Sequence, residues 1–380
     1  RGLGHDARRP AMTPASSAAF APTEDQVRRI VSAAARAPSA ENCQPFTFQW
    51  DGRELSLLHD PERGRHRLNP RNHVSSLTLG FLLEALALAA SAEGLRLEDT
   101  LHVPPSTSPV WATVRFAEGA GTDGLVDALQ TRRTDRRLYR GGSLQAPVFG
   151  ELRQEAGRFP GVGLYLAPRP EGEFLTFCLE ADSLVWRDAA AYQDVLRWTR
   201  FSEEELRRTR DGFSWRSLGL PLPGLPGLRL TRHEAVRRAL QGTQVYRASA
   251  LWLRAQLASS AGLVCITAPP GHPEALVAAG RLALRAWLRL NRSGHAVQPM
   301  SLQSTPIYDL EVSGLPGDLP PGTRERYLRA GTLLARAFGY TAPELPVWMC
   351  RTGRAPPRPP ETDTLRLPVE RLLSIRERRG

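Results

Sequence analysis

Residues 131–139, with the sequence TRRTDRRLY, combine side chains that suit a phosphate group. A phosphate dianion is held best by charge-assisted hydrogen bonds, which the guanidinium groups of Arg132 and Arg133 and the hydroxyl of Thr134 can donate. Arg136 lies just beyond them and adds another guanidinium group. The alternative interpretation is a solvated basic helix end, because charged runs usually face water.

The composition favours arginine for this role. The chain has 380 residues, a formal net charge of +11 and no lysine in its sequence. The absence of lysine excludes a lysine Schiff base and a phosphate loop that depends on lysine. Any phosphate must therefore be held by arginine or by backbone N–H groups, and the guanidinium fork bonds phosphate bidentately.

A second polar cluster occupies residues 37–48, APSAENCQPFTF, between a predicted helix and a predicted strand. It places a hydroxyl, two amides and two prolines in one turn. The motif is similar to the Ala-Pro-Ser-x-x-Asn-x-Gln-Pro-Trp turn of nitroreductase-like flavoproteins, with Phe46 in place of the usual Trp. The alternative is a tight helix-to-strand turn, which also favours Asn and Pro.

The resemblance implies an α+β fold with FMN bound non-covalently, and it implies that this turn lies against the isoalloxazine ring. Pro38, Ser39 and Ala40 would then contact the ring, and Asn42 would contact a polar edge. Gln44 either joins them or shapes the turn. Such contacts tune the flavin, whereas the redox chemistry belongs to the cofactor.

Three further segments fit the resemblance. Arg132-Arg133-Thr134, with Arg136, resembles the Arg-x-Ser signature that binds the FMN phosphate. One segment of the family runs along the ring near N5, and it corresponds here to Gln298, Pro299, Met300 and Ser301. A backbone N–H is the expected contact to N5. The alternative interpretation of this segment is the start of a strand. Arg351 and Arg354 correspond to late basic residues on the phosphate, and the alternative is a solvent-facing tail.

Two long Ala- and Leu-rich helices, over residues 73–93 and 273–292, look like copies of one another. Gly80 and Gly280 lie at matching places within them, and Gly94 and Gly294 follow their ends. A mid-helix glycine costs about 1 kcal/mol relative to alanine, so its presence in both helices predicts that they touch at their centres. Coincidence between two helices of similar composition is the alternative.

The repeat predicts a duplicated unit folded as a pseudo-dimer. Nitroreductases are homodimers with FMN at the interface, and this chain resembles the fused, mycobacterial Acg-like members of the family. We expect halves at residues 22–124 and 125–360, a disordered arm at 1–21 and a tail at 361–380. Only the first half carries the Pro-Ser turn and only the second carries Arg-Arg-Thr, which predicts one competent FMN site and one degenerate site per chain.

Local signals predict most of the secondary structure. A capping box of Thr23 and Gln26 starts a helix that ends near Arg36, and Asp51-Gly52 predicts a hairpin. Asn72 is expected to cap the first long helix. Further strands are expected at 110–116, 162–166, 262–268 and 347–350, and further helices at 125–131, 148–156, 174–210, 234–240, a segment reaching 257, and 323–338. Residues 211–230, rich in Gly and Pro, predict an irregular segment that is either a lid or a loop docked on the core.

Other classes of protein are disfavoured. The arginines are dispersed without long runs, which favours a basic solvated surface over a nucleic-acid partner. The apolar segment at 74–90 contains Ser, Thr and Glu and is expected to be a buried helix, not a membrane span. The four cysteines lack CxxC spacing, which disfavours a zinc or disulfide framework and fits a reducing cytoplasmic compartment. Cys265 and Cys350 lie in apolar runs and are expected to be core thiols. The histidines are scattered without metal-ligand spacing, so no metal site is expected. The sequence has no Gly-x-Gly-x-x-Gly motif after a strand, so no Rossmann domain is expected.

The sequence thus predicts an FMN-dependent oxidoreductase of the nitroreductase type, with NAD(P)H as donor or with oxygen reoxidising the flavin, acting on an unknown small or peptide substrate. As a pseudo-dimer it needs no second chain, so a monomer or a weak homodimer is expected. Tyr139, Tyr192 and Tyr308 are open candidates for a general acid. The alternative function is a protein that sequesters FMN under a lid formed by 211–230.

Overall fold

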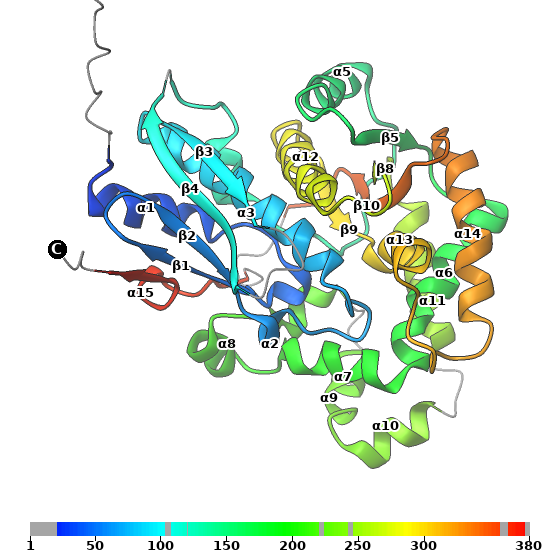
Figure 1. The fold of residues 1–380 in the computed structure, drawn as a ribbon. Coiled ribbons are helices and arrows are strands. Elements are labelled where there is room, and N and C mark those ends of the chain that lie inside the picture. Colours follow the sequence, from blue (N-terminus) through cyan, green and yellow to red (C-terminus); the bar gives the residue numbers. More distant parts are fainter. Residues whose placement is uncertain are drawn as a thin grey trace, which may run out of the picture.

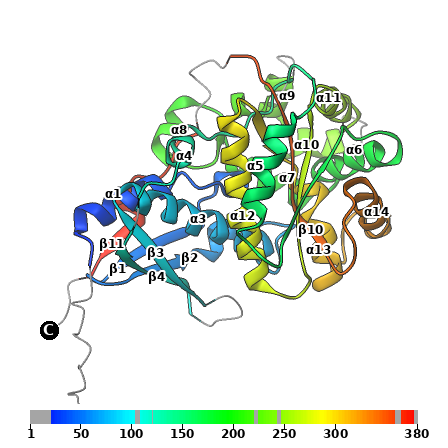
Figure 2. The same ribbon diagram turned by 90° about the horizontal axis from the view of Figure 1, so that it is seen from above.

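Two β-sheets lie on opposite sides of a pair of long helices in the computed structural model (Figures 1 and 2). The structure describes residues 21–102, 108–119, 121–219, 224–241, 246–357 and 364–376. The first sheet has the strand order β11-β1-β2-β4-β3. Its strands are β1 (Phe46–Trp50), β2 (Leu55–His59), β3 (Leu95–Leu101), β4 (Val110–Glu118) and β11 (Leu373–Ile375).

The second sheet repeats the order that β1, β2, β4 and β3 have in the first. Its strands are β5 (Gly163–Ala167), β8 (Gly262–Ala268), β9 (Ala296–Pro299) and β10 (Leu345–Gly353), and their order is β5-β8-β10-β9. In each sheet a long helix follows the second strand: α3 (His73–Ala92) after β2 and α12 (Pro273–Arg292) after β8. This α+β arrangement is consistent with a duplicated unit, and the domain boundaries at 124 and 360 remain predictions.

The two long helices touch at their glycines, as the repeat predicts. A Cβ atom added to Gly80 would lie 2.1 Å from the Val277 carbonyl oxygen, and one added to Gly280 would lie 2.2 Å from the Leu77 carbonyl oxygen. Any side chain at either position would therefore force the two backbones apart. The window of α3 with the highest mean hydropathy is apolar enough to span a membrane, but 83% of it is buried inside the protein.

The first half begins as its local signals predict. Helix α1 (Glu24–Ala34) starts at Thr23, where both hydrogen bonds of the capping box are present, and buries four apolar residues. β1 and β2 pair antiparallel, and the Asp51 carboxylate accepts hydrogen bonds from the backbone N–H groups of Arg53 and Glu54. The cap of α3 differs from the prediction: Asn72 makes no side-chain cap bond, and Asn69 Oδ1 instead accepts from the Val74 N–H at 3.0 Å.

Further helices join these elements. They are α2 (Pro61–Gly64), η1 (Ala40–Asn42), α4 (Val126–Thr131), α5 (Ala146–Ala156), η3 (Ser301–Gln303), α13 (Thr305–Val312) and α14 (Thr323–Phe338). A buried charge cluster ties α12 to its neighbours. Arg285 donates from Nη1 to Glu84 at 2.7 Å, from Nη2 to Asp123 at 2.9 Å and from Nε to Glu155. Because Arg285 and Glu155 are both buried, this cluster fixes the position of α5 against α12.

The segment between β5 and β8 is a mainly helical insertion. It contains α6 (Gly172–Arg187), α7 (Ala189–Trp198), α8 (Glu203–Thr209), α9 (Gly224–Leu230), α10 (Glu234–Gln241) and α11 (Tyr246–Ala258). The expectation that 211–230 is irregular is corrected for most of its described residues. β7 (Phe213–Ser214) pairs in parallel with β6 (Thr199–Arg200) and leads into η2 (Trp215–Leu218). The buried Phe213, which packs with Trp198 and Cys43, explains why this segment is ordered despite its Gly and Pro.

The C-terminal segment is also more structured than predicted. β10 continues to Gly353, so Arg351 lies in a strand and not in an extended tail. Within the expected tail, residues 364–376 include α15 (Val369–Leu372) and β11, which pairs in parallel with β1. Burial of Leu367, Leu372 and Leu373 in the core supplies the physical reason. Residues 1–20 of the predicted arm lie outside the described residues.

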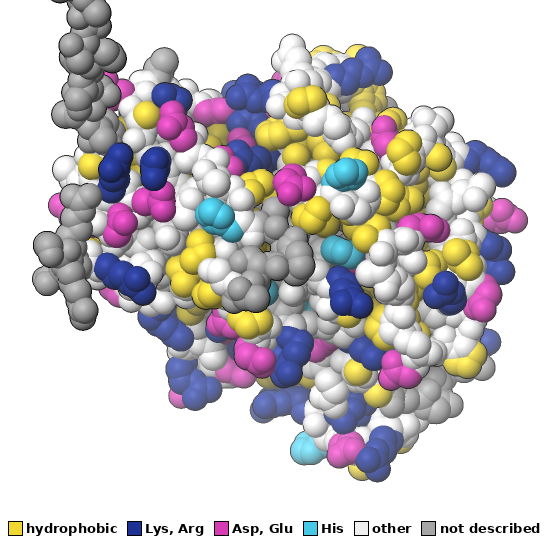
Figure 3. Space-filling model, in the orientation of Figure 1, with side chains coloured by type: hydrophobic (Ala, Val, Ile, Leu, Met, Phe, Trp, Pro, Cys, Tyr) yellow, Lys and Arg dark blue, Asp and Glu magenta, His cyan; other side chains and the backbone are white. Residues whose placement is uncertain are grey.

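The surface charge agrees with a dispersed pattern on the face in view. Figure 3 shows arginine side chains spread over many elements and interspersed with acidic side chains. All four cysteines are free and buried. In the ladder between β8 and β10, Cys265 lies opposite Met349 and Cys350 lies opposite Val264.

Candidate functional site

The turn that carries the flavoprotein-like motif has an unusual backbone. Glu41, Asn42 and Gln44 all have positive φ angles, of 43°, 57° and 50°. Non-glycine residues rarely adopt this left-handed conformation, and it persists where surrounding contacts impose it. The run of three therefore requires strong local anchoring.

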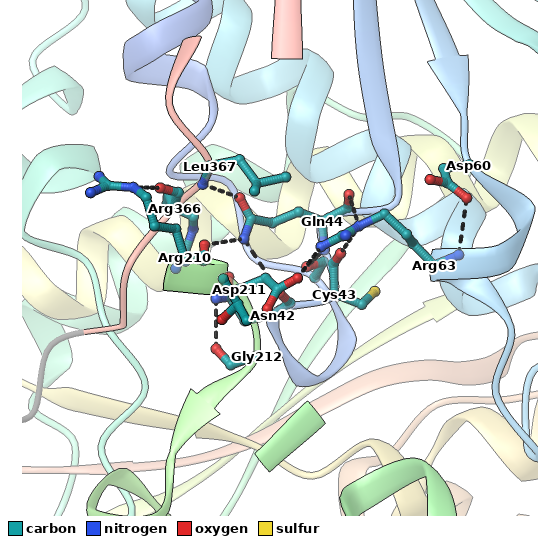
Figure 4. Close-up of polar contacts among 12 residues, drawn as sticks. Asn42, Cys43, Gln44, Asp60, Arg63, Arg210, Asp211, Gly212, Arg366 and Leu367 are labelled. Atoms are coloured by element: carbon teal, nitrogen blue, oxygen red, sulfur yellow. Dashed lines mark hydrogen bonds and ion pairs between the residues drawn. The ribbon is translucent and has the colours of Figure 1, made fainter. Parts of the chain in front are cut away.

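The anchors are the two amides of the turn (Figure 4). Asn42 Nδ2 donates to the Gly212 carbonyl at 2.7 Å and to the Leu365 carbonyl at 3.0 Å. Gln44 Nε2 donates to the Arg210 carbonyl at 3.0 Å, and Gln44 Oε1 accepts from the Leu367 N–H at 2.8 Å. Both amides thus join the turn to the insertion and to the C-terminal segment. Their amide nitrogens are occupied, so the expected contact of Asn42 with a ligand is left to its Oδ1 atom.

A cavity of about 330 Å³ opens beside this turn, and we call it the ring cavity. Its volume lies in the range of small-molecule sites. Its walls come from both halves and from the insertion. Pro38, Ser39 and Ala40 line it from the turn, Leu77 and Phe81 from α3, Trp287 from α12, Trp348 from β10, and Gln298, Pro299, Met300 and Ser301 from β9 and η3. The cavity therefore combines apolar and aromatic walls with polar side chains from several elements.

A smaller cavity of about 70 Å³, here the arginine cavity, shares residues with the ring cavity. Pro38, Ser39, Glu41, Thr134 and Arg136 line both. The arginine cavity is otherwise lined by Arg36, Asn42, Arg132, Arg133, Phe213, Thr364 and Arg366. Five guanidinium groups therefore converge at one end of the ring cavity, with Glu41 as the acidic side chain among the lining residues.

Burial makes this concentration of positive charge costly. Arg132 is 3% exposed, and burial together with the charges of Arg366 and Arg36 holds its pKa well below the usual value. Burial and the charge of Arg36 lower the pKa of Arg366 to about 9. Such shifts mean that the cationic forms lack sufficient compensation from the protein. A bound anion would supply it.

Unpartnered polar atoms point to the same ligand chemistry. The Nε atoms of Arg132 and Arg366 and the Oδ1 atom of Asn42 are buried without a hydrogen-bond partner in the described part of the chain. Arg132 is held in place, because its Nη2 donates to the Arg36 carbonyl at 3.0 Å and its guanidinium lies 4.5 Å from the centre of the Trp287 ring. Phosphate oxygens can accept from the two Nε–H groups, and a hydroxyl can donate to Asn42 Oδ1.

Most of the residues predicted from the sequence meet here. The predicted residues that line one or both cavities are Pro38, Ser39, Ala40, Asn42, Arg132, Arg133, Thr134, Arg136, Pro299, Met300 and Ser301. The Met300 N–H, a candidate contact to the ring, donates instead to the Met349 carbonyl at 2.7 Å. Gln44 lies behind the turn and shapes it.

The late arginines are a correction. Arg351 is fully buried and donates to Gln298 Oε1 at 2.6 Å, to the Gln256 carbonyl at 3.1 Å and to the Arg137 carbonyl at 2.8 Å. With its guanidinium committed to these acceptors, it braces β10 and lines neither cavity. Arg354 is exposed and also lines neither. Arg366 is the late arginine that lines the arginine cavity.

Sequence reasoning missed several titratable residues of the ring cavity. Glu41, His66, Asp182 and Asp194 line it, as does Arg67. The basic Asn- and Pro-rich segment PERGRHRLNPRN before α3 was the available signal for His66 and Arg67. In the ranges that the structure describes, no three His, Cys, Asp or Glu residues group as metal ligands.

The three tyrosines considered as general acids are also a correction. Tyr139 OH donates to the Asp135 carbonyl at 2.6 Å, and Tyr192 OH lies 2.6 Å from Thr231 Oγ1. Tyr308 is 1% exposed and packs against His73. All three are buried with partners of their own and do not line either cavity.

Comparison with known proteins gives structural matches only. No family model and no curated protein matches the chain. A nitroreductase from Anabaena variabilis is similar over 87% of this chain and 88% of its own, with 9% identity and a TM-score of 0.45. A nitroreductase-like protein from Bacillus cereus is similar over 68% of this chain and 98% of its own, with 12% identity and a TM-score of 0.34. A nitroreductase with bound FMN from Bacteroides fragilis is similar over 64% of this chain and 96% of its own, with 12% identity and a TM-score of 0.31.

The three similar structures are thus of nitroreductases or nitroreductase-like proteins, one of them with bound FMN. Identities of this size describe an arrangement of elements. The choice of ligand and chemistry depends on the two cavities themselves.

Proposed function

We propose that this chain binds one FMN and acts as a flavin-dependent oxidoreductase of the nitroreductase type. The observation that carries the proposal is the junction of the ring cavity with the arginine cavity. A space lined by apolar and aromatic side chains next to a buried cluster of arginines fits a ligand with an aromatic ring at one end and a phosphate at the other. FMN has this form, with a hydroxyl-rich chain between the two.

The residues divide the work by their chemistry. Arg132 and Arg366 would hold the phosphate through their unpartnered Nε–H groups, with Arg133, Thr134 and Arg136 beside them. Asn42 Oδ1 would accept from a hydroxyl of the chain. Pro38, Ser39 and Ala40 would pack along one side of the ring. When bound, FMN supplies the redox chemistry, because its ring exchanges a hydride equivalent at N5.

Other phosphate-bearing aromatic cofactors fit less well. Pyridoxal phosphate acts through a Schiff base with lysine, and the sequence contains no lysine. We propose NAD(P)H as the electron donor for reduction of a second substrate. In the alternative dehydrogenase reaction the substrate itself is oxidised, and oxygen is the electron acceptor. The substrate is a small molecule or a peptide segment that reaches the ring cavity, and one chain supplies the whole site.

The proposal is tested by comparing FMN with riboflavin, which lacks the phosphate. Binding to the apoprotein is followed by quenching of flavin fluorescence, for the native chain and for Arg366→Ala. A hydrogen bond to a charged group contributes about 1.5–3 kcal/mol, so the variant should bind FMN roughly 10- to 150-fold more weakly. Its affinity for riboflavin should not change.

Arg354→Ala is the matched control, because Arg354 is exposed and outside both cavities. It should leave both affinities unchanged. Equal affinity of the native chain for FMN and riboflavin, or an equal loss in both arginine variants, would overturn the proposed phosphate site.

A second candidate function is sequestration of FMN under a cover. Residues 211–219 lie over the arginine cavity: Phe213 lines it, and the Ser217 carbonyl accepts from Arg136 Nη1 at 3.2 Å. Gly219 lies so close to the Arg136 backbone that an added Cβ would sit 2.6 Å from its carbonyl oxygen. Anaerobic mixing with NADPH separates the two functions. Rapid bleaching of the flavin supports the oxidoreductase, and an unreduced flavin supports sequestration.

A further inference from the structure

His66 stands between the ring cavity and an open cleft on the surface. The cleft, of about 540 Å³, is lined by Arg65, Arg67, Pro70, Arg71, Ala190 and the segment 313–316. His66, Arg67 and Asp194 line both the cleft and the ring cavity. The imidazole of His66 is therefore a wall shared by the enclosed cavity and the solvent-filled cleft.

The neighbours of this imidazole favour a proton on each nitrogen. Nδ1 lies 3.1 Å from the Gly64 carbonyl oxygen, and Nε2 lies 2.9 Å from Glu41 Oε2. A carbonyl and a carboxylate are both acceptors, so each nitrogen serves as a donor only when the ring is an imidazolium. The ring also stacks on Trp198, at 6.4 Å between centroids and 21° between planes.

The charges around His66 support the protonated form. Burial lowers its pKa, but the Glu41 carboxylate from η1, the Gly64 carbonyl and the Asp194 carboxylate from α7 together raise the pKa to about 9. The cations on the side of the cleft, Arg65 and Arg67, have acidic partners of their own in Glu62, Asp188 and Asp318. His66 therefore keeps its proton at neutral pH.

The Glu41–His66 contact is close but loosely directed. Nε2 of His66 lies 2.9 Å from Oε2 of Glu41 as an ion pair, and neither atom has a hydrogen-bond partner in the described ranges. Glu41 is held in place by the strained turn, whose φ angles are fixed by the amides of Asn42 and Gln44. Glu41 and His66 thus form a positioned pair that lines the ring cavity.

We propose that the His66–Glu41 dyad donates the proton that accompanies reduction of a substrate in the ring cavity. This inference rests on the proposed function. An unsaturated acceptor gains two electrons and one hydrogen as a hydride equivalent from the cofactor, and one proton from the His66 imidazolium, which becomes neutral imidazole. Water in the surface cleft then returns one proton to the ring. The tyrosines, by contrast, face away from the cavity.

The first test requires no cofactor. Histidine resonances of the apoprotein are titrated by NMR, with His66→Gln identifying the signal and His102→Gln, an exposed site, as the control. The His66 signal should titrate near pH 9. In Glu41→Gln it should move towards the ordinary value near 6.5. A pKa near 6.5 in the native chain, or no movement in Glu41→Gln, overturns the dyad.

The second test separates proton transfer from electron transfer. The FMN-loaded protein is reduced with dithionite and mixed in a stopped-flow instrument with a quinone, which takes up protons, or with ferricyanide, which takes up electrons only. Loss of a general acid typically costs about 10²- to 10⁴-fold, so His66→Gln should slow quinone reduction by at least about 100-fold. Its reaction with ferricyanide should match that of the native chain.

The outcomes distinguish the two proposals. A chain that binds no flavin fails the proposed function while the NMR titration still tests the dyad. A variant that slows both acceptors equally, or neither, contradicts the assignment of His66 as proton donor. In the native chain, quinone reduction should also fall above pH about 9, and in Glu41→Gln this limb should move to lower pH.

Discussion

The contact between α3 and α12 predicts the effect of a single methyl group on stability and on the site. In Gly280→Ala the new Cβ would lie 2.2 Å from the Leu77 carbonyl oxygen and 3.0 Å from the Gly80 Cα. Both neighbours are backbone atoms within helices, so no side chain can rotate away. The helices must separate, and Leu77 and Trp287, which line the ring cavity from these helices, move with them.

The magnitude follows from two opposing effects. Overpacking of a tight interface costs about 1–3 kcal/mol, and a backbone contact belongs at the upper end of that range. Replacing a mid-helix glycine with alanine returns about 1 kcal/mol of helix propensity. The expected net loss is therefore about 2 kcal/mol. With an unfolding entropy of about 2 cal/mol/K per residue, the Tm should fall by roughly 2–3 °C.

Gly150→Ala is the matched control. Gly150 also lies within a helix, α5, but it is exposed and an added Cβ would meet nothing within 4 Å. This variant should gain about 0.5–1 kcal/mol from propensity alone. Urea denaturation followed by circular dichroism measures both variants. If Gly280→Ala is as stable as Gly150→Ala, the close crossing of the helices is wrong.

Three further predictions concern charge. Glu155→Gln removes a buried partner of Arg285 and should lower the free energy of unfolding by about 3 kcal/mol. Glu151→Gln, on the exposed side of α5, should change it by less than about 1 kcal/mol. Equal urea midpoints for the two variants would contradict this prediction. Burial raises the pKa values of the Glu155 and Asp123 carboxyl groups, but hydrogen bonds from Arg285 outweigh it and leave both pKa values lowered. The stabilisation from these two carboxylates is therefore complete above pH about 4.5 and is lost as the pH falls through their folded-state pKa values. Glu155→Gln should accordingly lose less stability than the native chain between pH about 5 and about 3. Inorganic phosphate should raise the Tm of the apoprotein by neutralising the arginine cavity, and this increase should be smaller in Arg366→Ala; equal increases in both would place the anion elsewhere.

Local sequence signals predicted the elements whose causes are local. The capping box of Thr23 starts α1, Asp51-Gly52 turns the first hairpin, and Pro273 opens α12. The matched glycines Gly80 and Gly280 predicted the contact between α3 and α12 because a mid-helix glycine is costly unless another backbone approaches it.

The candidate site was predictable only in part, because its remaining contacts are distant in sequence. Arg366 reaches the arginine cavity because β11 pairs with β1, a contact between residues more than 300 positions apart that no local pattern indicates. Asn42 and Gln44 match the family motif by type, but their amides bind carbonyl groups of the insertion and the C-terminal segment. Arg351 has the expected charge but is surrounded by acceptors within the second half.

The same limit applies to the proton source. His66 belongs to no recognisable motif, and its role depends on Glu41, which is 25 positions earlier and is placed by a strained turn. The tyrosines were reasonable by chemistry, and only their orientation in the fold removes them.

The visible absorption spectrum of the purified protein, followed by heat release and identification of any pigment, tests the central claim most directly. Flavin bands with about one FMN released per chain are expected if the ring cavity and the arginine cavity form one complete site. A colourless protein that takes up no added FMN would contradict the claim, and two FMN per chain would contradict the prediction of a single competent site.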